Sequence, residues 1–345
     1  MKRVIIADIR SVKKDGDIPG HFVPVAQNYI DVLGNKYKVF VAGGDVYYKH
    51  FQKESVIKLP YNISGNSIID KIKVFVNSWV LFNNAGKDII IIQQASLVTT
   101  FLAIALLYWS TGKLFLIVYN TAALNTRLKK FLYYFAKRKI SGIICSSKEI
   151  GDLYDKPFCK VSDYIKPYIP QFIPFNKKTY DFCILGGIYE DKGTVDAAKF
   201  FGGTPYKVII AGKDNEPGIG KKMLEATEGA NNIDLQMRYI SSAEYSNYMS
   251  NSKYCVLNYR GTYFDRSSGV VLDAILAGTP VVGAECKALD FVKKNELGYV
   301  YKDISDINLS NIMNQDTYDN YILNIEKYFN IQKEYAKELV LFIDK

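Results

Sequence analysis

Residues 265–282 read DRSSGVVLDAILAGTPVV, and this stretch decides the fold of the chain. Small residues at 267–269 suit the start of a helix, and the apolar residues that follow them fill it. Gly278 suits a left-handed stop after the helix, and Pro280 cannot continue the helix. Residues 281–282 then open a buried strand. A loop that enters a short helix, followed directly by a strand, predicts an α/β domain with a parallel sheet.

Two carboxylates in this stretch lie beside an expected anion-binding position. The backbone N–H groups at Ser267, Ser268 and Gly269 face whatever lies in front of the helix, which suits a diphosphate. Asp265 on the loop and Asp273 inside the helix cannot bind phosphate, but they can accept hydrogen bonds from hydroxyl groups. A diphosphate between two polyols describes a nucleotide-sugar. The alternative is that both aspartates are surface residues that flank the helix.

The same residues resemble a known signature. Asp265 and Asp273 have the offset of the E-x7-E motif of retaining GT-B glycosyltransferases, with Asp in place of both Glu, and LDAILAGTPVV is similar to that family's LEAMACGTPVV. The resemblance implies an α/β fold of two doubly wound, Rossmann-like domains that face a central cleft. It also implies that Asp273 binds the ribose hydroxyls of the donor and that Asp265 binds hydroxyls of the transferred sugar.

A second phosphate-facing corner is expected where a strand ends near Gly187 and Lys192-Gly193 opens a helix. The family pattern is GRxxxxKG, in which Arg and Lys hold the diphosphate. Residues 186–193 read GGIYEDKG, so the Lys and the final Gly match, while Gly187 and Ile188 occupy the region of the missing Arg. The alternative for Lys192 is an ordinary surface lysine. Two arginines that flank the loop before Asp265 are the expected substitutes, namely Arg260 and Arg266.

The first domain is predicted from a strand at 2–9, a glycine-containing loop and a helix at 21–33. The resemblance makes His21 an acceptor-site residue, with a capping or surface histidine as the alternative. Asn120 follows a buried strand, and it is the nearest match to a family histidine close to the transferred sugar. The DGD sequence at 15–17 has the form of a metal motif, but a solvated turn is the better interpretation.

Alternating strands and helices place the domain boundaries. We expect an N-terminal acceptor-side domain at 1–166, a proline-containing linker at 167–179 and a C-terminal nucleotide-sugar domain at 180–320. Residues 321–345 predict a helix. The resemblance implies that this helix crosses back to the first domain.

Residues 127–139 read RLKKFLYYFAKRK and combine six basic residues with aromatic neighbours. Such a helix can lie on an anionic membrane surface. The alternative is a domain helix with its apolar residues in the core and its lysines in water. The net charge of +9 favours anionic partners without choosing among nucleotide, membrane and nucleic acid.

Composition restricts the remaining classes. The 345-residue length favours two domains. Five cysteines without C-x-x-C spacing suit free, buried thiols in a reducing cytoplasm, and two histidines exclude a His-rich metal centre. The N-terminus predicts a strand rather than a signal peptide. The most apolar segment, 97–109, is shorter than the about 20 residues that a membrane-spanning helix needs.

We therefore expect a retaining, metal-independent glycosyltransferase of the hexosyltransferase type, without a cofactor and without an enzyme nucleophile. The expected acceptor is a glycan or lipid-linked glycan of bacterial surface polysaccharide synthesis. The expected location is cytoplasmic, peripheral at the inner face of the plasma membrane. The alternatives are a GT-B-fold sugar-nucleotide epimerase and a noncatalytic nucleotide-sugar-binding partner subunit. A nucleic-acid-binding protein is a third alternative, which we do not favour because the chain lacks a nucleic-acid module.

Overall fold

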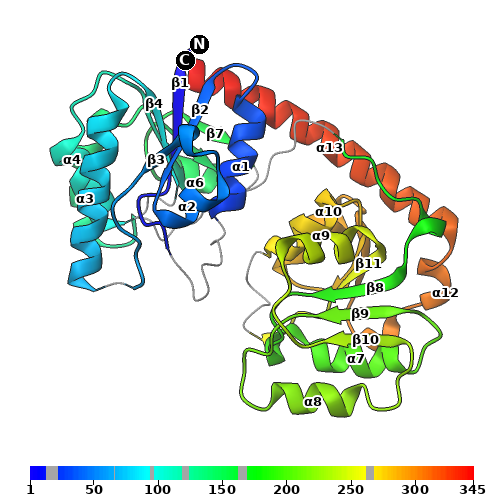
Figure 1. Ribbon diagram of the computed structural model, residues 1–345. Coiled ribbons are helices and arrows are strands. Elements are labelled where there is room, and N and C mark those ends of the chain that lie inside the picture. The colour runs from blue at the N-terminus through cyan, green and yellow to red at the C-terminus, as the bar shows by residue number, and fades with distance from the viewer. Residues whose placement is uncertain (13–21, 66, 94–96, 119–123, 162–168, 262–267) are drawn as a thin grey trace. The chain divides into compact units, whose positions relative to one another are not determined.

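The computed structural model describes residues 1–12, 22–65, 67–93, 97–118, 124–161, 169–261 and 268–345 (Figure 1). The chain divides into two compact units. Unit 1 comprises Met1–Pro167 together with Ile331–Lys345, and unit 2 comprises Tyr168–Asn330. Each unit has its own parallel sheet and its own cores, and each is described by itself.

Unit 1 contains a seven-stranded parallel sheet in the order β3-β2-β1-β4-β5-β6-β7. The strand order reverses between β1 and β4, as in a doubly wound fold. The strands are β1 Arg3–Ala7, β2 Lys38–Gly43, β3 Val56–Lys58, β4 Ile89–Ile92, β5 Leu114–Val118, β6 Gly142–Cys145 and β7 Phe158–Lys160. The helices are α1 Phe22–Leu33, α2 Asp45–His50, α3 Ile68–Ala85, α4 Val98–Leu107, α5 Arg127–Ala136 and α6 Lys148–Asp152.

The central strands of unit 1 are apolar along their whole length because helices cover both faces of the sheet. In β4, Ile90 and Ile92 belong to the core beneath α3, α4 and α5, whereas Ile89 and Ile91 belong to the core beneath α1. The end of α13 Gln315–Asp344 completes this second core with Ala336, Leu339 and Ile343.

Unit 2 contains a six-stranded parallel sheet in the order β10-β9-β8-β11-β12-β13. Its order reverses between β8 and β11. The strands are β8 Tyr180–Leu185, β9 Val208–Ala211, β10 Ile233–Gln236, β11 Ser252–Leu257, β12 Val281–Ala284 and β13 Gly298–Tyr301. The helices are α7 Thr194–Gly202, α8 Ile219–Ala226, α9 Ser242–Ser250, α10 Gly269–Leu276, α11 Asp290–Lys294 and α12 Leu309–Ile312.

The predicted α/β class with two doubly wound, Rossmann-like domains is confirmed by these two sheets. The prediction that all five cysteines are buried and unpaired is confirmed as well. Among the helices in the described ranges, none is both long and apolar enough to cross a membrane.

Candidate functional site

The described part of the stretch DRSSGVVLDAILAGTPVV, residues 268–282, forms helix α10 and the start of strand β12 in unit 2. Helix α10 begins at Gly269 with Ser268 as its N-cap residue, and it ends before Gly278, which has the left-handed φ of 69°. The side chain of Ser268 does not cap the helix. Its Oγ shares a hydrogen bond of 2.7 Å with the hydroxyl of Tyr259. The first N–H groups of α10 have no acceptor within the helix, as at any helix start, so they are available to an anion.

Asp273 lies in the second turn of α10, half-buried, and it is held by a tyrosine of the neighbouring helix α9. The hydroxyl of Tyr245 donates a hydrogen bond of 3.1 Å to Asp273 Oδ2. Burial, together with the adjacent carboxylate, keeps the pKa of Tyr245 well above its usual value. Tyr245 therefore stays protonated and fixes the direction of the carboxylate.

Lys192 and Asp273 both influence the pKa of one buried thiol, that of Cys255 in β11. The hydrogen bond with Cys183 and burial raise the pKa of Cys255 well above its usual value, Asp273 raises it further and Lys192 lowers it. The thiol therefore stays neutral and is no nucleophile.

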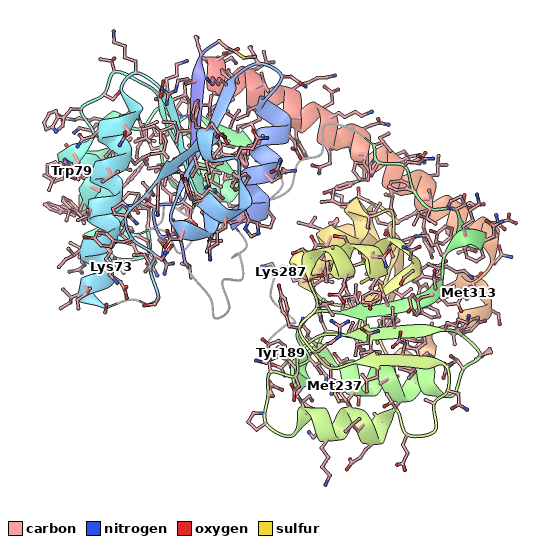
Figure 2. All side chains as sticks on the ribbon, in the orientation of Figure 1. Lys73, Trp79, Tyr189, Met237, Lys287 and Met313 are labelled. Carbon is pink, nitrogen blue, oxygen red and sulfur yellow. The ribbon has the colours of Figure 1, made fainter. Side chains whose placement is uncertain are left out.

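Lys192 ends the single 3-10 turn Glu190–Lys192 that precedes α7. Its ammonium lies near the carboxyl end of β8, where a Cβ added to Gly186 would be 3.3 Å from Lys192 Nζ. It also lies 5.6 Å from the centre of the Tyr189 ring, which Figure 2 labels. Burial lowers the pKa of the Lys192 ammonium. A cation in such a poorly solvated position attracts an anion more strongly than a cation in open water does.

Two of the predicted glycines have clear structural roles beside Lys192. Gly193 has a left-handed φ of 62° and is the N-cap residue of α7. A Cβ at Gly193 would collide with the carbonyl oxygen of Asn258, which directly follows β11. Gly187 is half-buried beyond the end of β8, where a Cβ would collide with the side-chain amide of Asn215. Gly193 lets two backbone segments approach one another, and Gly187 leaves room for the Asn215 side chain, both at the edge where ligands bind in doubly wound sheets.

Arg260 lies in the same corner, but its guanidinium is already engaged. It forms ion pairs with Asp196 of α7 and with Glu190, the latter at 3.2 Å, and Glu190 also pairs with Lys222 at 2.8 Å. The N–H of Arg260 donates to the carbonyl of Asp191 at 2.8 Å. A guanidinium that two carboxylates neutralise attracts a diphosphate less than an unpaired one would.

Five predicted site residues lie outside the described residues. They are His21, Asn120, Asp265, Arg266 and Ser267. Their roles stay predictions. Of the others, the structure groups Lys192, Gly193, Arg260, Ser268, Gly269 and Asp273 around the carboxyl ends of β8 and β11 and the start of α10.

Sequence reasoning missed a cluster of polar residues in unit 1. Asp8 directly follows β1 and is only 3% exposed. Its carboxylate accepts hydrogen bonds from the backbone N–H of Ser11 at 3.0 Å and from the hydroxyl of Tyr47 at 3.1 Å. Burial raises the pKa of Asp8 although these hydrogen bonds oppose the rise. Asp8 thus anchors the first residues of the loop after β1.

Gln93 directly follows β4, the strand next to β1, and is 1% exposed. Among the described residues, neither its amide nitrogen nor its amide oxygen has a hydrogen-bond partner. Native interiors rarely leave a polar side chain in this state, so such a group calls for an explanation. Asp8 and Gln93 lie at the point where the strand order of unit 1 reverses, and both could have been found as polar residues that end apolar strands.

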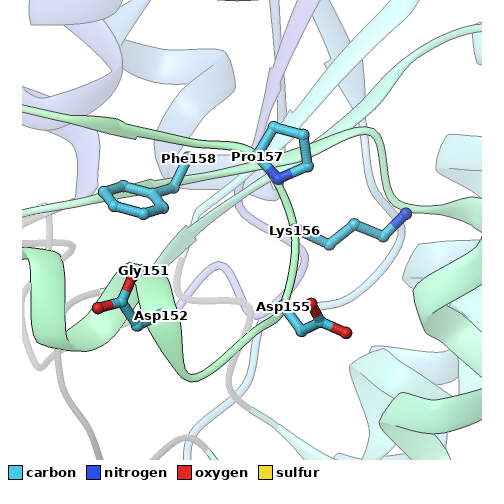
Figure 3. Close-up of a pocket in the computed structure, with 6 residues that line it drawn as sticks. All are labelled: Gly151, Asp152, Asp155, Lys156, Pro157 and Phe158. Carbon is cyan, nitrogen blue, oxygen red and sulfur yellow. The ribbon is translucent and has the colours of Figure 1, made fainter.

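The pocket of about 370 Å³ in Figure 3 lies between the end of α6 and the start of β7. Its charged lining residues include Asp152, which pairs with Lys148 at 2.8 Å, and Asp155, which pairs with Lys137. The pocket contains none of the predicted site residues, and its carboxylates are occupied by local ion pairs. Within the described ranges, no three His, Cys, Asp or Glu residues are grouped to hold a metal ion.

No protein-family model and no curated protein matches the sequence. Solved structures do match it over the whole chain. One is a glycosyltransferase from Rickettsia africae ESF-5, with 13% identity, coverage of 100% of this chain and 99% of that chain, and a TM-score of 0.64. Another is trehalose-6-phosphate from E. coli bound with UDP-2-fluoro glucose, with 7% identity, coverage of 100% and 99%, and a TM-score of 0.65.

A third similar structure is Anabaena Alr3699/HepE in complex with UDP. It has 13% identity, coverage of 97% of this chain and 95% of that chain, and a TM-score of 0.58. At these identities the similarity concerns the fold. The chain has the GT-B fold, with two parallel-sheet, Rossmann-like domains.

Proposed function

We propose that the protein is a glycosyltransferase that moves a sugar from a nucleotide-diphosphate donor to a glycan or lipid-linked glycan acceptor. The observation that supports this proposal best is the Lys192 ammonium beside Gly186 at the carboxyl end of β8, together with the Asp273 carboxylate that Tyr245 holds in α10. A cation, a helix N-terminus and a fixed carboxylate are the groups that a diphosphate and a ribose require. Similar structures that hold UDP or UDP-2-fluoro glucose agree with a nucleotide donor.

In this proposal Asp273, oriented by Tyr245, accepts hydrogen bonds from the ribose hydroxyls. Lys192 and the first N–H groups of α10 stabilise the negative charge that develops on the departing diphosphate. Asp265 holds hydroxyls of the transferred sugar. The acceptor binds unit 1, whose sheet edge carries Asp8 and Gln93.

The proposed reaction retains the configuration of the sugar and needs neither a metal nor an enzyme nucleophile. The bond between the anomeric carbon and the diphosphate oxygen breaks, and a bond to the acceptor oxygen forms on the same face. The proton of the acceptor hydroxyl passes to the departing phosphate. We assign the protein to hexosyl transfer in bacterial surface polysaccharide synthesis.

The test is binding of UDP, GDP, ADP and CMP, and of their common sugar conjugates, measured by thermal shift in EDTA. A ligand that binds only the folded state raises the melting temperature. We expect one nucleotide diphosphate to stabilise the protein, and we expect Asp273→Ala to remove the effect. If no nucleotide shifts the melting temperature, the donor site is wrongly assigned.

A second test separates catalysis from binding. Wild-type protein should release the nucleotide diphosphate from the donor when acceptor is present, and Asp265→Ala and Asp273→Ala should each reduce this release strongly while the far-UV circular dichroism stays unchanged. Donor binding without transfer or hydrolysis would favour the noncatalytic partner subunit. The engaged guanidinium of Arg260 is the specific observation that keeps this alternative in view. Conversion of the nucleotide-sugar without acceptor would favour the epimerase.

A further inference from the structure

Helix α5 has two apolar faces, and only one of them is in the core. Tyr133 and Ala136 are buried in the core of unit 1. Phe131 is 60% exposed and Phe135 is 50% exposed, and they share the outer face of the helix with two further exposed apolar residues, Leu128 and Tyr134. The spacing of 128, 131 and 135 is that of one helical stripe. A domain helix needs only the inner face to be apolar, so the outer stripe has no role within unit 1.

Helix α3 repeats this arrangement. Its inner face carries Val74, Leu81 and other buried residues, whereas Ile69, Ile72 and Trp79 are 65%, 59% and 52% exposed. Positions 69, 72 and 79 again follow a single helical stripe. Figure 2 shows Trp79 projecting outward from α3. Monomeric proteins rarely expose extended apolar surface of this kind.

Helix α4 packs against both of these helices and adds exposed apolar residues to the same layer. Its inner face packs in the same core as those of α3 and α5. Leu106 near its end is 53% exposed, and Trp109 just beyond it is 79% exposed. The Lys139 ammonium lies 4.0 Å from the centre of the Trp109 ring, and it donates a hydrogen bond to the carbonyl of Ala105. The 3-10 turn Lys137–Lys139 after α5 thus places a cation directly beside Trp109, the more exposed of the two tryptophans.

The charge of this surface is positive. Helices α3, α4 and α5 contain one acidic residue, Asp70, which is buried in the capping box of α3. The basic residues on these helices and on the 3-10 turn that follows α5 are Lys71, Lys73, Arg127, Lys129, Lys130, Lys137, Arg138 and Lys139. Lys137 is paired with Asp155. Two copies of such a face would repel one another, whereas an anionic surface would be attracted.

We propose that this surface docks the protein on a bilayer that contains anionic phospholipids. The α3–α5 face is defined by Ile72, Trp79, Leu106, Trp109, Phe131 and Phe135. Its aromatic and aliphatic side chains enter the boundary between headgroups and acyl chains, and the lysines and arginines contact the phosphate groups. The inference uses unit 1 alone, so it stands whether or not the proposed sugar transfer is correct.

Tryptophan fluorescence tests the proposal directly, because the two tryptophans of the chain, Trp79 and Trp109, both lie on this face. The full-length protein is mixed with vesicles of phosphatidylcholine containing about 30% phosphatidylglycerol, and with vesicles of phosphatidylcholine alone. We expect a blue shift and quenching by brominated lipid with the anionic vesicles only, and loss of both at about 0.5 M NaCl. Trp79→Phe and Trp109→Phe show which helix enters the lipid.

Cosedimentation with the same vesicles provides the variant test. Phe131→Ser combined with Phe135→Ser should reduce binding to anionic vesicles by about tenfold or more, since it removes two aromatic side chains from the inserted face. The matched control is Leu224→Ser combined with Tyr239→Ser in unit 2, where the side chains are 58% and 53% exposed. It should bind as wild type. Equal binding of both double variants would overturn the proposal, as would a blue-shifted, dimeric protein without lipid.

Discussion

Tyr245→Phe removes one hydroxyl and tests whether Asp273 must be fixed in order to bind a nucleotide. In the wild type, the hydroxyl donates a hydrogen bond of 3.1 Å to Asp273 Oδ2. A hydrogen bond to a charged group contributes about 1.5–3 kcal/mol, and we expect the lower end because Asp273 is half-buried and water can replace the donor. The free energy of unfolding of unit 2 should therefore fall by about 1.5 kcal/mol.

The effect on binding follows from the freedom that the carboxylate gains. Ordering one side chain on binding costs about 0.5–1.5 kcal/mol, which corresponds to about a 2- to 12-fold weaker affinity for the nucleotide diphosphate. Isothermal titration calorimetry measures this change. Tyr248→Phe is the matched control. Tyr248 lies on the same helix, and its hydroxyl donates a hydrogen bond of 2.9 Å to Gln236 instead of Asp273. It should change the nucleotide affinity less than about twofold.

A double-mutant cycle with Asp273→Asn decides whether the two residues act together. If Tyr245 acts by orienting the carboxylate, Tyr245→Phe should have little further effect in the Asp273→Asn background. Unchanged nucleotide affinity in Tyr245→Phe, together with lost affinity in Asp273→Asn, would refute the orienting role. Equal weakening in Tyr245→Phe and Tyr248→Phe would instead indicate a general loosening of α9.

Three further predictions concern Gly193 and Lys192 in the same corner, and Lys178 near the amino ends of β8 and β11. Gly193→Ala should lower the free energy of unfolding by about 2 kcal/mol or more, because its φ is 62° and a Cβ meets a backbone carbonyl, whereas Gly203→Ala, which meets nothing, should be nearly neutral in chemical denaturation. Lys192→Met should weaken nucleotide-diphosphate binding by about 10- to 100-fold, against no change for the exposed Lys221→Met in the same titration. Burial lowers the pKa of Lys192, so its ammonium loses its proton at a lower pH than an ordinary lysine does. As the pH is raised, the wild type should therefore lose nucleotide-diphosphate binding at a pH below the usual pKa of lysine. Burial lowers the pKa of Lys178 from 10.5 to about 8, so the unfolded chain binds the extra proton between these values and stability rises with pH across them. Between about pH 7 and about pH 9, the free energy of unfolding of the wild type should rise by about 1 kcal/mol relative to that of Lys178→Met, as measured by denaturant melts. The same pH dependence in both proteins would contradict a lowered pKa of Lys178.

The sequence predicted the central part of each sheet because helices cover both faces of these strands. Strand β4 reads IIII, and such continuous apolar runs are recognisable without a structure. The edge strands β7 and β13 escaped prediction. Strand β7 has three residues, and β13 begins at a glycine with φ 155° and is mostly half-buried, so neither shows a clear apolar pattern.

Local sequence suggests candidate site residues but not the groups that contact them. Asp273 and Lys192 are predicted as site residues because each belongs to a loop-to-helix corner with a recognisable pattern. Tyr245 contacts Asp273 from another helix, and Glu190 and Asp196 engage Arg260 from another loop. Such contacts depend on how distant segments meet, which spacing does not reveal. The two faces of α5 were also ambiguous, because its inner and outer apolar residues each follow helical spacing.

The division of unit 1 has a consequence for how the chain is made. Its second core needs Ala336, Leu339 and Ile343, and Gly142 in β6 leaves room for the ring of Phe342. Asp344 accepts a hydrogen bond of 2.6 Å from Tyr37. These residues leave the ribosome after all of Tyr168–Asn330. Unit 1 is therefore begun before unit 2 and completed after it. Until α13 is made, the part of the second core that α1 and α2 do not cover stays exposed, and transiently exposed apolar surface of this kind is what chaperones bind.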